Sequence, residues 1–475
     1  YVVINIVKSN LLKNYLLNPI PILFSKTPKI IIALIVRIFI KQRKYNGGDT
    51  IFYSKYSEKI TILMLDSDRY RGDLEILSKS NKFRVLHIRQ IFQSLLTNIF
   101  LKGDVTVQQL SNIKSTSNLY NQHTRTISLF RKVLKYIYYF INIDCVTTVH
   151  FKYVPDYYWT LISEELSVPY ICLHRECNLL SPTIRDRVVR MMNLIGRFHG
   201  SHIVVHNKRC KEVFVETNFA SNDQVTICGA LRMDEIGSSK LVQHNNFITD
   251  KKKVFTLFYF PVVSTTFCID KFGVEKYGIN TGYWINDKSK RCWEFNESLF
   301  TLLHLKILSM AKKYEDIDFI IKVKPEFKKH YSWKFYENFL NDSDIDWNRL
   351  KNYRIESDVD VRSLINKSNV VCGLQSSTTV ESIFMDKKVI IPLFKELHKT
   401  KYYDQFPWRD YEDLCCIVED DVSFEREVLA SFDSSLPEYI VDKDRSEELF
   451  KECFGFNDGE SLSRYENIII GIVSK

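Results

Sequence analysis

Residues 370–381 of the chain read VVCGLQSSTTVE, and this stretch decides the fold class. Residues 370–372 are apolar and predict a buried β-strand, Gly373 permits a tight turn, and the hydroxyl residues that follow predict the start of a helix. A strand that passes through a glycine turn into a helix is half of a βα unit, the repeating element of parallel sheets. We therefore expect an α/β protein.

The same stretch is a candidate phosphate site. Ser377 or Thr378 can cap the helix, with Glu381 about one turn later. The amide groups of a first helical turn attract anions. A plain capping box needs no ligand, but the four consecutive hydroxyl residues 376–379 exceed what a cap requires. We predict that this turn binds phosphate.

Apolar runs alternate with amphipathic stretches along the rest of the chain. Because 475 residues exceed the roughly 250–300 that one hydrophobic core serves, we expect two domains. The polar stretch Gly237–Lys253 predicts the linker. The predicted divisions are a basic and apolar segment, 1–50, and two α/β domains, 51–240 and 241–475.

The expected strands are 60–65, 84–88, 145–149, 170–173, 203–205 and 225–227 in the first domain, and 254–260, 319–323, 370–372 and 389–391 in the second. Helices are expected at 73–79, 296–313, 378–385 and 461–473, and over most of 95–139. Ligands bind beyond the carboxyl ends of parallel strands, so we expect a cleft between the domains that both line with loops.

Composition excludes several classes of protein. Hydrophobic residues make up 45% and charged residues 26%, which is ordinary for a globular chain and excludes a disordered or fibrous one. The net charge of +9 favours anionic partners, but no aromatic and basic pattern typical of RNA binding occurs, so nucleic acid is not an expected partner. The 11 cysteines form no CxxC pair and predict reduced thiols, with no metal site.

The amino-terminal segment carries an apolar run, Ile30–Ile40, interrupted by Arg37 and flanked by Lys29, Lys41 and further basic residues. This run is shorter than the 18 residues of a membrane-spanning helix, and basic residues follow where a signal peptide would be cleaved. The pattern predicts a helix at an anionic membrane surface. The alternative is a helix packed on the protein's own core.

Three further clusters of polar residues follow predicted strands. Lys322 and Lys324-Pro325 end one strand, with both lysines on one face. His174-Arg175-Glu176 ends another, and Arg232 and Asp234 follow a third, after Gly229. Solvated lysines, a salt-bridged loop and an internal Arg–Asp pair are the structural alternatives for the three clusters.

In order, these motifs are HRE, GxxRxD, KxKP and GxQSSTxxE, and together they resemble the GT-B glycosyltransferases of bacterial surface polysaccharide assembly. The similarity is greatest to the retaining β-Kdo transferases, which use CMP-Kdo. It covers roughly Ile60 to the carboxyl terminus. Lys324-Pro325 departs from the His-Pro motif of related sialyltransferase-like enzymes, whereas Ser376-Ser377 matches their second motif.

The resemblance implies a fold of two Rossmann-like domains, the first for acceptor and catalysis and the second for the nucleotide sugar. Asp234 would be the nucleophile and Glu176 the general acid/base, about 5–5.5 Å apart. Arg232 or His174 would meet the Kdo carboxylate. The residues implied for the CMP-linked donor are Lys322, Lys324, Pro325, Gln375, Ser376, Ser377, Thr378 and Glu381.

The resemblance also implies the partners. The acceptor would be a glycan or glycolipid, at the cytoplasmic face of the cell membrane. Lysines and helix-terminal amides can stabilise a leaving CMP without a metal, so transfer is expected to be metal-independent.

Three alternatives stay open. A CDP-polyol phosphotransferase of the same fold usually carries Asp-Tyr-Ser-Ser, where this chain has Leu374 and Gln375 before its serines. A nucleotide-sugar 2-epimerase would need no acceptor. A non-catalytic scaffold of polysaccharide assembly would carry a decayed site.

Overall fold

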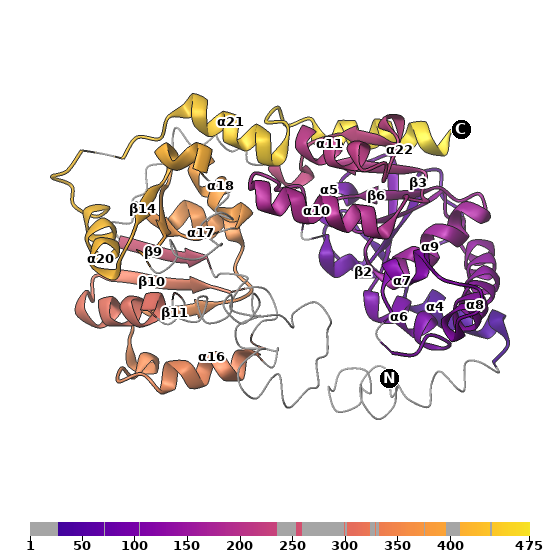
Figure 1. Cartoon of the computed structure of the whole chain (residues 1–475), viewed down its shortest axis with the longest axis horizontal. Helices are drawn as coiled ribbons and strands as arrows, with labels where there is room; N and C mark the ends of the chain where they lie inside the picture. The colour runs from indigo at the N-terminus through magenta and orange to yellow at the C-terminus, as the bar shows by residue number, and fades with distance from the viewer. Residues whose placement is uncertain are drawn as a thin grey trace. The chain divides into compact units, whose positions relative to one another are not determined.

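The computed structural model describes residues 27–70, 72–103, 105–234, 253–258, 299, 302–323, 328, 332–374, 376–395, 409–437 and 439–475. The chain forms two compact units (Figure 1). The first contains the chain up to Cys177, Asp186–Ser239 and Phe454–Lys475, and the second contains Asn178–Arg185 and Lys240–Cys453. The predicted linker, except Lys253, lies outside the described residues, as do Lys324, Pro325 and Gln375.

The first unit is built on one eight-stranded sheet. Its spatial order is β2 (Asp49–Thr50), β1 (Lys41–Arg43), β4 (Phe83–Ile88), β3 (Ile60–Leu65), β5 (Cys145–Thr148), β6 (Tyr170–Leu173), β7 (His202–Val205) and β8 (Val225–Ile227). The strands from β4 to β8 are parallel, and the β1–β2 hairpin adds antiparallel to β4. The sequences of the parallel strands are nearly continuous apolar runs because helices cover the sheet.

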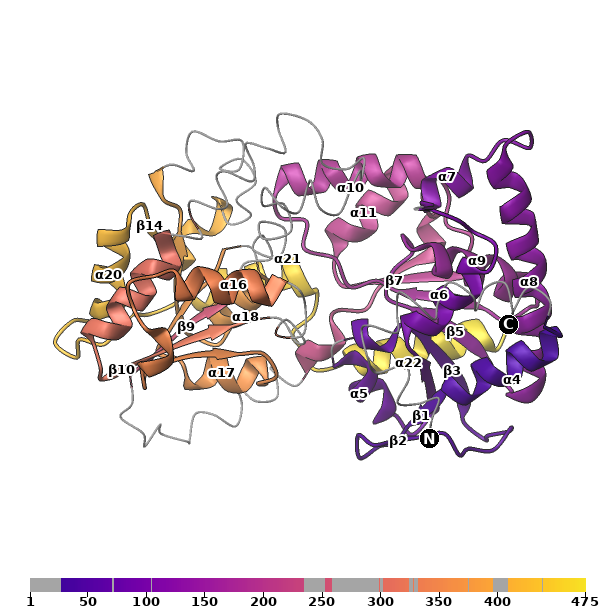
Figure 2. The same cartoon turned by 90° about the horizontal axis from the view of Figure 1, so that it is seen from below.

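The helices of the first unit surround this sheet (Figure 2). They are α4 (Lys29–Phe39), α5 (Asp73–Ser78), α6 (Gln90–Asn98), α7 (Val107–Ser111), α8 (Asn118–Phe140), α9 (Val154–Glu165), α10 (Pro182–Ile195, from Asp186 on), α11 (Lys208–Glu216) and α22 (Ser461–Val473). The stretch predicted to be mostly helical from Leu95 to Tyr139 is divided into three helices. Gly103 has a positive φ of 77°, and Thr106 and Ser117 cap α7 and α8.

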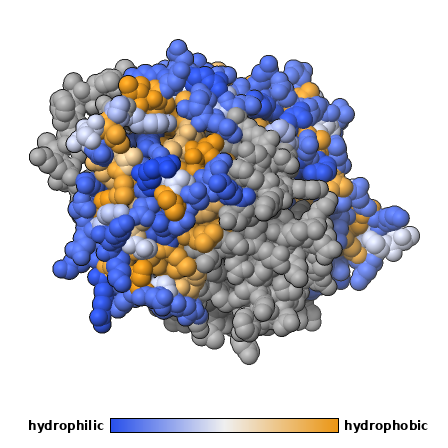
Figure 3. All heavy atoms as spheres, turned by 60° about the vertical axis from the view of Figure 1, so that its left-hand side comes forward, coloured by the Kyte–Doolittle hydropathy of each residue, from blue (hydrophilic) through white to orange (hydrophobic). Residues whose placement is uncertain are grey.

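The second unit is built on a six-stranded parallel sheet. Its order is β11 (Tyr353–Glu356), β10 (Ile317–Lys322), β9 (Lys253–Phe258), β12 (Val370–Cys372), β13 (Lys388–Pro392) and β14 (Cys416–Val418). Its helices include α16 (Ser332–Asn341), α17 (Val361–Lys367), α18 (Ser377–Phe384), α20 (Asp421–Ala430) and α21 (Lys443–Phe454), and residues 302–313 are also helical. On the face shown in Figure 3, hydrophilic residues cover much of the described surface and hydrophobic ones lie between them.

These two sheets confirm the predicted fold class of two Rossmann-like α/β domains. If the strands of the second sheet are numbered by their order in the chain, their spatial order is 3-2-1-4-5-6, which is the strand order of dinucleotide-binding domains. Numbered in the same way, the six parallel strands of the first sheet have the spatial order 2-1-3-4-5-6. The direction in which successive strands are added reverses between β3 and β5. The predicted cleft between the domains stays a prediction.

The last helix, α22, belongs to the first unit, whereas the sequence placed it in a second domain running to Lys475. Its buried residues Tyr465 and Ile469 pack in the same core cluster as Ile62 and Met64 of β3. Figure 1 shows the yellow helix lying along this unit. An apolar stripe on α22 reveals that the helix is buried, but the stripe does not reveal which sheet buries it.

The described part of the amino-terminal segment is also part of the first unit. Helix α4 lies beside α8 and buries Ile32, Ala33 and Val36. Residues 1–26 lie outside the described residues. Among the described residues, no helix is long and apolar enough to cross a membrane.

Candidate functional site

The serine-rich turn of the second unit lies where the strand order of its sheet reverses. Strands β9 and β12 are neighbours, and the connections from them lead to opposite halves of the sheet. This switch point is where open α/β sheets bind ligands. A Cβ on Gly373, directly after β12, would lie 2.9 Å from Thr379 Oγ1 and 3.9 Å from Phe258 Cβ at the end of β9. Glycine therefore allows the first turn of α18 to approach the switch point.

The hydroxyl residues after Gly373 form the amino-terminal cap of α18. Ser376 Oγ accepts a hydrogen bond from the Thr378 N–H at 3.2 Å and donates one to Thr378 Oγ1 at 2.9 Å. The Ser377 and Thr378 side chains are half-buried. Thr379 Oγ1 is buried and has no hydrogen-bond partner among the described residues. The turn thus presents a helix amino terminus and several hydroxyl groups, which is a suitable receptor for a phosphate.

Lys322 is held by the protein itself. Its side chain is buried at the end of β10, and Nζ donates to the carbonyl oxygens of Val323 at 2.7 Å and Ser357 at 2.8 Å. Burial lowers the pKa of Lys322, and the acidic residues Asp358 and Glu356 oppose this. In this conformation Lys322 ties together the loops after β10 and β11. Glu381, one turn into α18, is likewise buried.

Charged side chains crowd the carboxyl edge of the sheet in the first unit, although most are buried. At its switch point, Asp66 follows β3 with a left-handed φ of 58° and pairs with Arg69. The Arg69 guanidinium lies 3.8 Å from the centre of the Tyr153 ring, in the loop after β5. A left-handed non-glycine residue carries strain, and such residues gather at functional sites.

Asp156, on the first turn of α9, faces Asp66. Burial raises the pKa of Asp156 well above its usual value, and the negative charge of Asp66 raises it further, against Arg69. Two carboxyl groups in one buried region cannot both ionise easily, so each disfavours ionisation of the other. Carboxyl groups with pKa values shifted in this way are found where acid–base chemistry occurs.

Glu176 is the most accessible carboxylate of the predicted catalytic group, with 56% of its side chain exposed. Its Oε2 lies 2.5 Å from Lys152 Nζ. Partial burial raises the pKa of Glu176, but the Lys152 ammonium outweighs burial and the pKa falls to about 2. Glu176 is therefore ionised at neutral pH and can accept a proton, although a pKa this low makes it a weak base.

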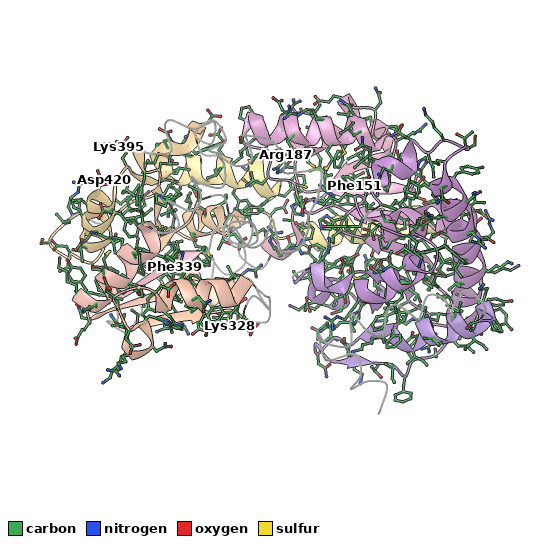
Figure 4. The ribbon with its side chains drawn as sticks, turned by 60° about the horizontal axis from the view of Figure 1, so that its bottom comes forward. Phe151, Arg187, Lys328, Phe339, Lys395 and Asp420 are labelled. Carbon is green, nitrogen blue, oxygen red and sulfur yellow. The ribbon has the colours of Figure 1, made fainter. Side chains whose placement is uncertain are left out.

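His174, on the same loop, is buried and stacks on Phe151 with the ring centres 5.1 Å apart. Phe151 is labelled in Figure 4. Burial lowers the pKa of His174 to about 4, and burial lowers that of neighbouring His150 to about 3. Both rings are neutral at physiological pH, so His174 can meet a substrate carboxylate only as a neutral hydrogen-bonding group.

Arg175 forms a buried ion pair, in agreement with the salt-bridged loop that was the structural alternative for this cluster. Its Nε lies 3.0 Å from Asp73 Oδ2, and its Nη1 donates to the carbonyl oxygen of Arg69 at 2.7 Å. Arg232 also favours the ionised form of Asp73, although burial raises the pKa of this carboxyl. The Arg232 guanidinium lies 5.2 Å from the Phe454 ring centre. These contacts hold the loops after β3, β6 and β8 together.

Asp234 has a structural role that the sequence did not predict. Its Oδ1 accepts a hydrogen bond from the Ser461 N–H at 3.1 Å, and its Oδ2 accepts one from the Leu462 N–H at 2.9 Å. Both amides belong to the first turn of α22, so Asp234 caps this helix. Glu176 and Asp234 are thus held by different partners, Lys152 and α22. The role of Asp234 as nucleophile stays a prediction.

One cluster of the described residues has side chains that could hold a metal. A ring nitrogen of His174 and the Sγ atoms of Cys177 and Cys210 lie within 4.8 Å of one another, all buried. Such ligands suit zinc or copper(I), although structural zinc sites have four. Cys177 Sγ already donates to the His174 carbonyl oxygen at 3.4 Å and accepts from the His206 N–H at 3.3 Å. Burial raises the pKa of Cys210 well above its usual value, which favours packed neutral thiols.

Several polar residues at this edge were not among the predicted site residues: Asp66, Arg69, Asp73, Lys152, Asp156, Arg175 and His206. Asp66 follows an apolar strand directly, and this position was the available signal. The partners of Asp73 and Asp156 lie on distant loops, so no local pattern reveals them.

Comparison with known proteins adds solved structures only, since no family model and no curated protein matches the chain. A UDP-GlcNAc 2-epimerase from Neisseria meningitidis bound to UDP-GlcNAc is 14% identical with a TM-score of 0.43, covering 87% of this chain and 100% of its own. One from Methanocaldococcus jannaschii is 12% identical with a TM-score of 0.45, covering 87% and 99%. MnaA of S. aureus with UDP is 11% identical with a TM-score of 0.45, covering 88% and 98%. Similarity this low does not assign an activity.

Proposed function

We propose that the chain is an enzyme that acts on a nucleotide-linked sugar, with the second unit binding the nucleotide. One observation carries the proposal: the hydroxyl-capped amino terminus of α18 lies at the switch point of a sheet with dinucleotide-binding strand order. A phosphate there gains amide and hydroxyl donors together with the positive end of the helix. The ionisable groups at the edge of the first unit supply the reacting acid and base.

The finer proposal is glycosyl transfer, with Kdo from CMP-Kdo as the donor. It rests on the resemblance of the HRE, GxxRxD and QSST motifs. In this reaction Glu176, which is ionised, accepts the proton of the attacking acceptor hydroxyl. CMP leaves while the α18 turn stabilises its phosphate.

A second candidate is 2-epimerisation of a nucleotide sugar, and the position of Asp234 favours it. A retaining double displacement needs a carboxylate nucleophile, but both oxygens of Asp234 accept hydrogen bonds from α22. Epimerisation beside the anomeric carbon needs a base and a stabilised nucleotide, without a covalent carboxylate intermediate. The same residues serve both reactions, so the product distinguishes them.

Binding is tested by thermal shift with CMP, CDP, UDP and GDP. A nucleotide at about 100 times its Kd adds about 2.7 kcal/mol to the free energy of unfolding. The Ser376→Ala, Thr378→Ala double variant should lose this shift, whereas Ser423→Ala, at the start of α20, should keep it. If no nucleotide raises the Tm of the wild-type chain, the proposed function is wrong.

The reaction is tested by incubating the preferred nucleotide sugar with and without a glycan acceptor. Release of nucleotide that depends on acceptor supports transfer, and a change of configuration at C2 without acceptor supports epimerisation. A preference for CMP supports the Kdo proposal, whereas a preference for UDP contradicts it.

A further inference from the structure

Helix α4 has a second apolar face besides the one that it buries in the first unit. Ile30, Ile31, Leu34 and Ile38 are 41%, 45%, 45% and 59% exposed. At 100° per residue these four side chains fall on one side of the helix. Ile32, Ala33, Val36 and Ile40, on the other side, are buried. The helix is therefore apolar on both sides, although the unit buries only one of them.

Further apolar side chains are exposed in the segment that follows α4. Tyr45 is 75%, Phe52 85% and Tyr56 66% exposed. The aromatic ring of Tyr53 receives the Arg37 guanidinium of α4, 4.0 Å from its centre, so this segment is joined to the helix. Aromatic residues with polar edges are typical of the boundary between lipid and water.

A basic hollow opens where α4 begins. This pocket of about 180 Å³ is lined by Lys29 of α4, Arg125, Ser128, Leu129 and Lys132 of α8, and Phe100. Three of its lining residues are cations and none is a carboxylate. Burial lowers the pKa of Lys29, and the positive charge of Lys132 lowers it further. An anion in the hollow would relieve this repulsion.

We propose that α4 and this hollow dock the first unit on an anionic phospholipid bilayer. The four aliphatic side chains enter the boundary between headgroups and acyl chains, and the hollow receives a lipid phosphate. At 11 residues the helix is too short to span a bilayer, so it lies in the interface. Helices α4 and α8 lie side by side in both views (Figure 1, Figure 2), so the cations that α8 contributes to the hollow lie beside α4.

The test is flotation of the full chain with vesicles of phosphatidylcholine alone or mixed with phosphatidylglycerol. We expect binding to the anionic vesicles only, weakening as salt rises because surface charges are screened. Leu34→Ser with Ile38→Ser should reduce binding about ten-fold by removing apolar contact. Arg125→Glu with Lys132→Glu should reduce it at least about ten-fold.

Two matched controls alter exposed positions of the second unit. Val422→Ser removes an apolar side chain that is 67% exposed, and Lys443→Glu reverses an exposed charge. Both should bind vesicles as the wild type does. If thermal unfolding of all variants is unchanged, the altered side chains act at the surface and not through the fold. The salt dependence of vesicle binding is measured on the wild-type chain, so this part of the test does not depend on any variant.

Three results would overturn the proposal. Equal binding to neutral vesicles removes the role of the cations, and normal binding of the Leu34, Ile38 variant removes that of the apolar face. A dimer that this variant converts to a monomer, measured by light scattering, would assign the face to contacts between copies. Nucleotide binding should persist in every variant, so failure here is distinguishable from failure of the proposed function.

Discussion

Asp234 has two alternative roles in the first unit, as the structural cap of α22 or as a catalytic nucleophile, and substitutions at this carboxylate distinguish them. As the cap of α22 it accepts two amide hydrogen bonds, and asparagine can replace only part of this. We expect Asp234→Ala to lower the free energy of unfolding by about 1–2 kcal/mol and Asp234→Asn by less. Urea unfolding followed by circular dichroism measures this.

The opposite pattern would restore Asp234 as the nucleophile. In that case Asp234→Asn abolishes turnover of the nucleotide sugar while its unfolding midpoint equals that of the wild type. Glu460→Ala, directly before α22 and without a side-chain capping bond, is the control and should change neither quantity much.

The ion pair of Lys152 with Glu176 predicts the pH dependence of the proposed reaction. Because the folded pKa of Glu176 is about 2, the wild type keeps its base ionised down to mildly acidic pH. Lys152→Met removes the cation and leaves burial, which raises the pKa. We expect an acid limb to appear in the kcat/KM profile at higher pH, whereas Lys152→Arg should keep the wild-type profile. Identical profiles for all three proteins would remove Glu176 from the role of base.

At the scale of elements, α22 reaches the first unit through an unusually close approach of two glycines. Gly455 has a φ of 89°, and a Cβ there would lie 2.0 Å from the His206 carbonyl oxygen and 3.1 Å from Gly229 Cα. Gly455→Ala should therefore lower the free energy of unfolding by at least about 2 kcal/mol and expose α22 to proteolysis.

Gly471, inside α22, is the matched control for this prediction. It has nothing within 4 Å of its Cβ position. Gly471→Ala should be neutral or stabilising by up to about 1 kcal/mol, because alanine favours helix. Equal proteolysis of both variants would show that the approach at Gly455 does not hold the helix in place.

Elements whose boundaries depend on local sequence could be predicted well. Strands β3, β6, β8 and β12 and helix α22 begin and end where expected, because each is an apolar run or stripe bounded by polar residues or glycine. The cap of α18 was also local, but the capping residue is Ser376 rather than the predicted Ser377 or Thr378. By contrast, the contacts of Asp234 with α22 join residues 227 and 228 positions apart, and no pattern along the chain specifies them.

At the scale of the whole molecule, the described histidines are distributed unevenly. Burial lowers the pKa of seven in the first unit: His87, His123, His150, His174, His199, His202 and His206. In the described part of the second unit it does so for His304. Acid should therefore affect the two units to different degrees.

Acid lowers the free energy of unfolding because the unfolded state binds more protons than the folded state. Unfolded histidines take up protons below about pH 6.5, whereas folded His174 and His202 stay neutral until about pH 4, so the stability that they contribute is full above pH 6.5 and falls as the pH drops through this window. A histidine that stays neutral in the folded state while it is protonated in the unfolded state contributes at most about 1.4 kcal/mol per pH unit. We expect hydrogen-exchange protection factors, which account for the slower intrinsic exchange at lower pH, to fall more between about pH 7 and pH 5 in the strands of the first unit than in those of the second.

A variant at His202 tests whether a buried histidine causes the pH dependence of stability in the first unit. The pKa of His202 falls to about 4, and its Nε2 lies 2.9 Å from Thr226 Oγ1. His202→Gln removes one titrating group and should flatten the pH dependence of the first unit by up to one proton. An equal loss of protection in both units would contradict the prediction.

The placement of α22 also bears on the order in which the chain is made. The ribosome completes the entire second unit before it synthesises the helix that covers the core around Ile62 and Met64. During translation an apolar face of the first unit therefore stays uncovered while more than 200 residues are synthesised, between Ser239 and Phe454. A nascent chain of this kind is a natural client for chaperones that shield exposed apolar surface, and stalling within the second unit would leave it prone to aggregate.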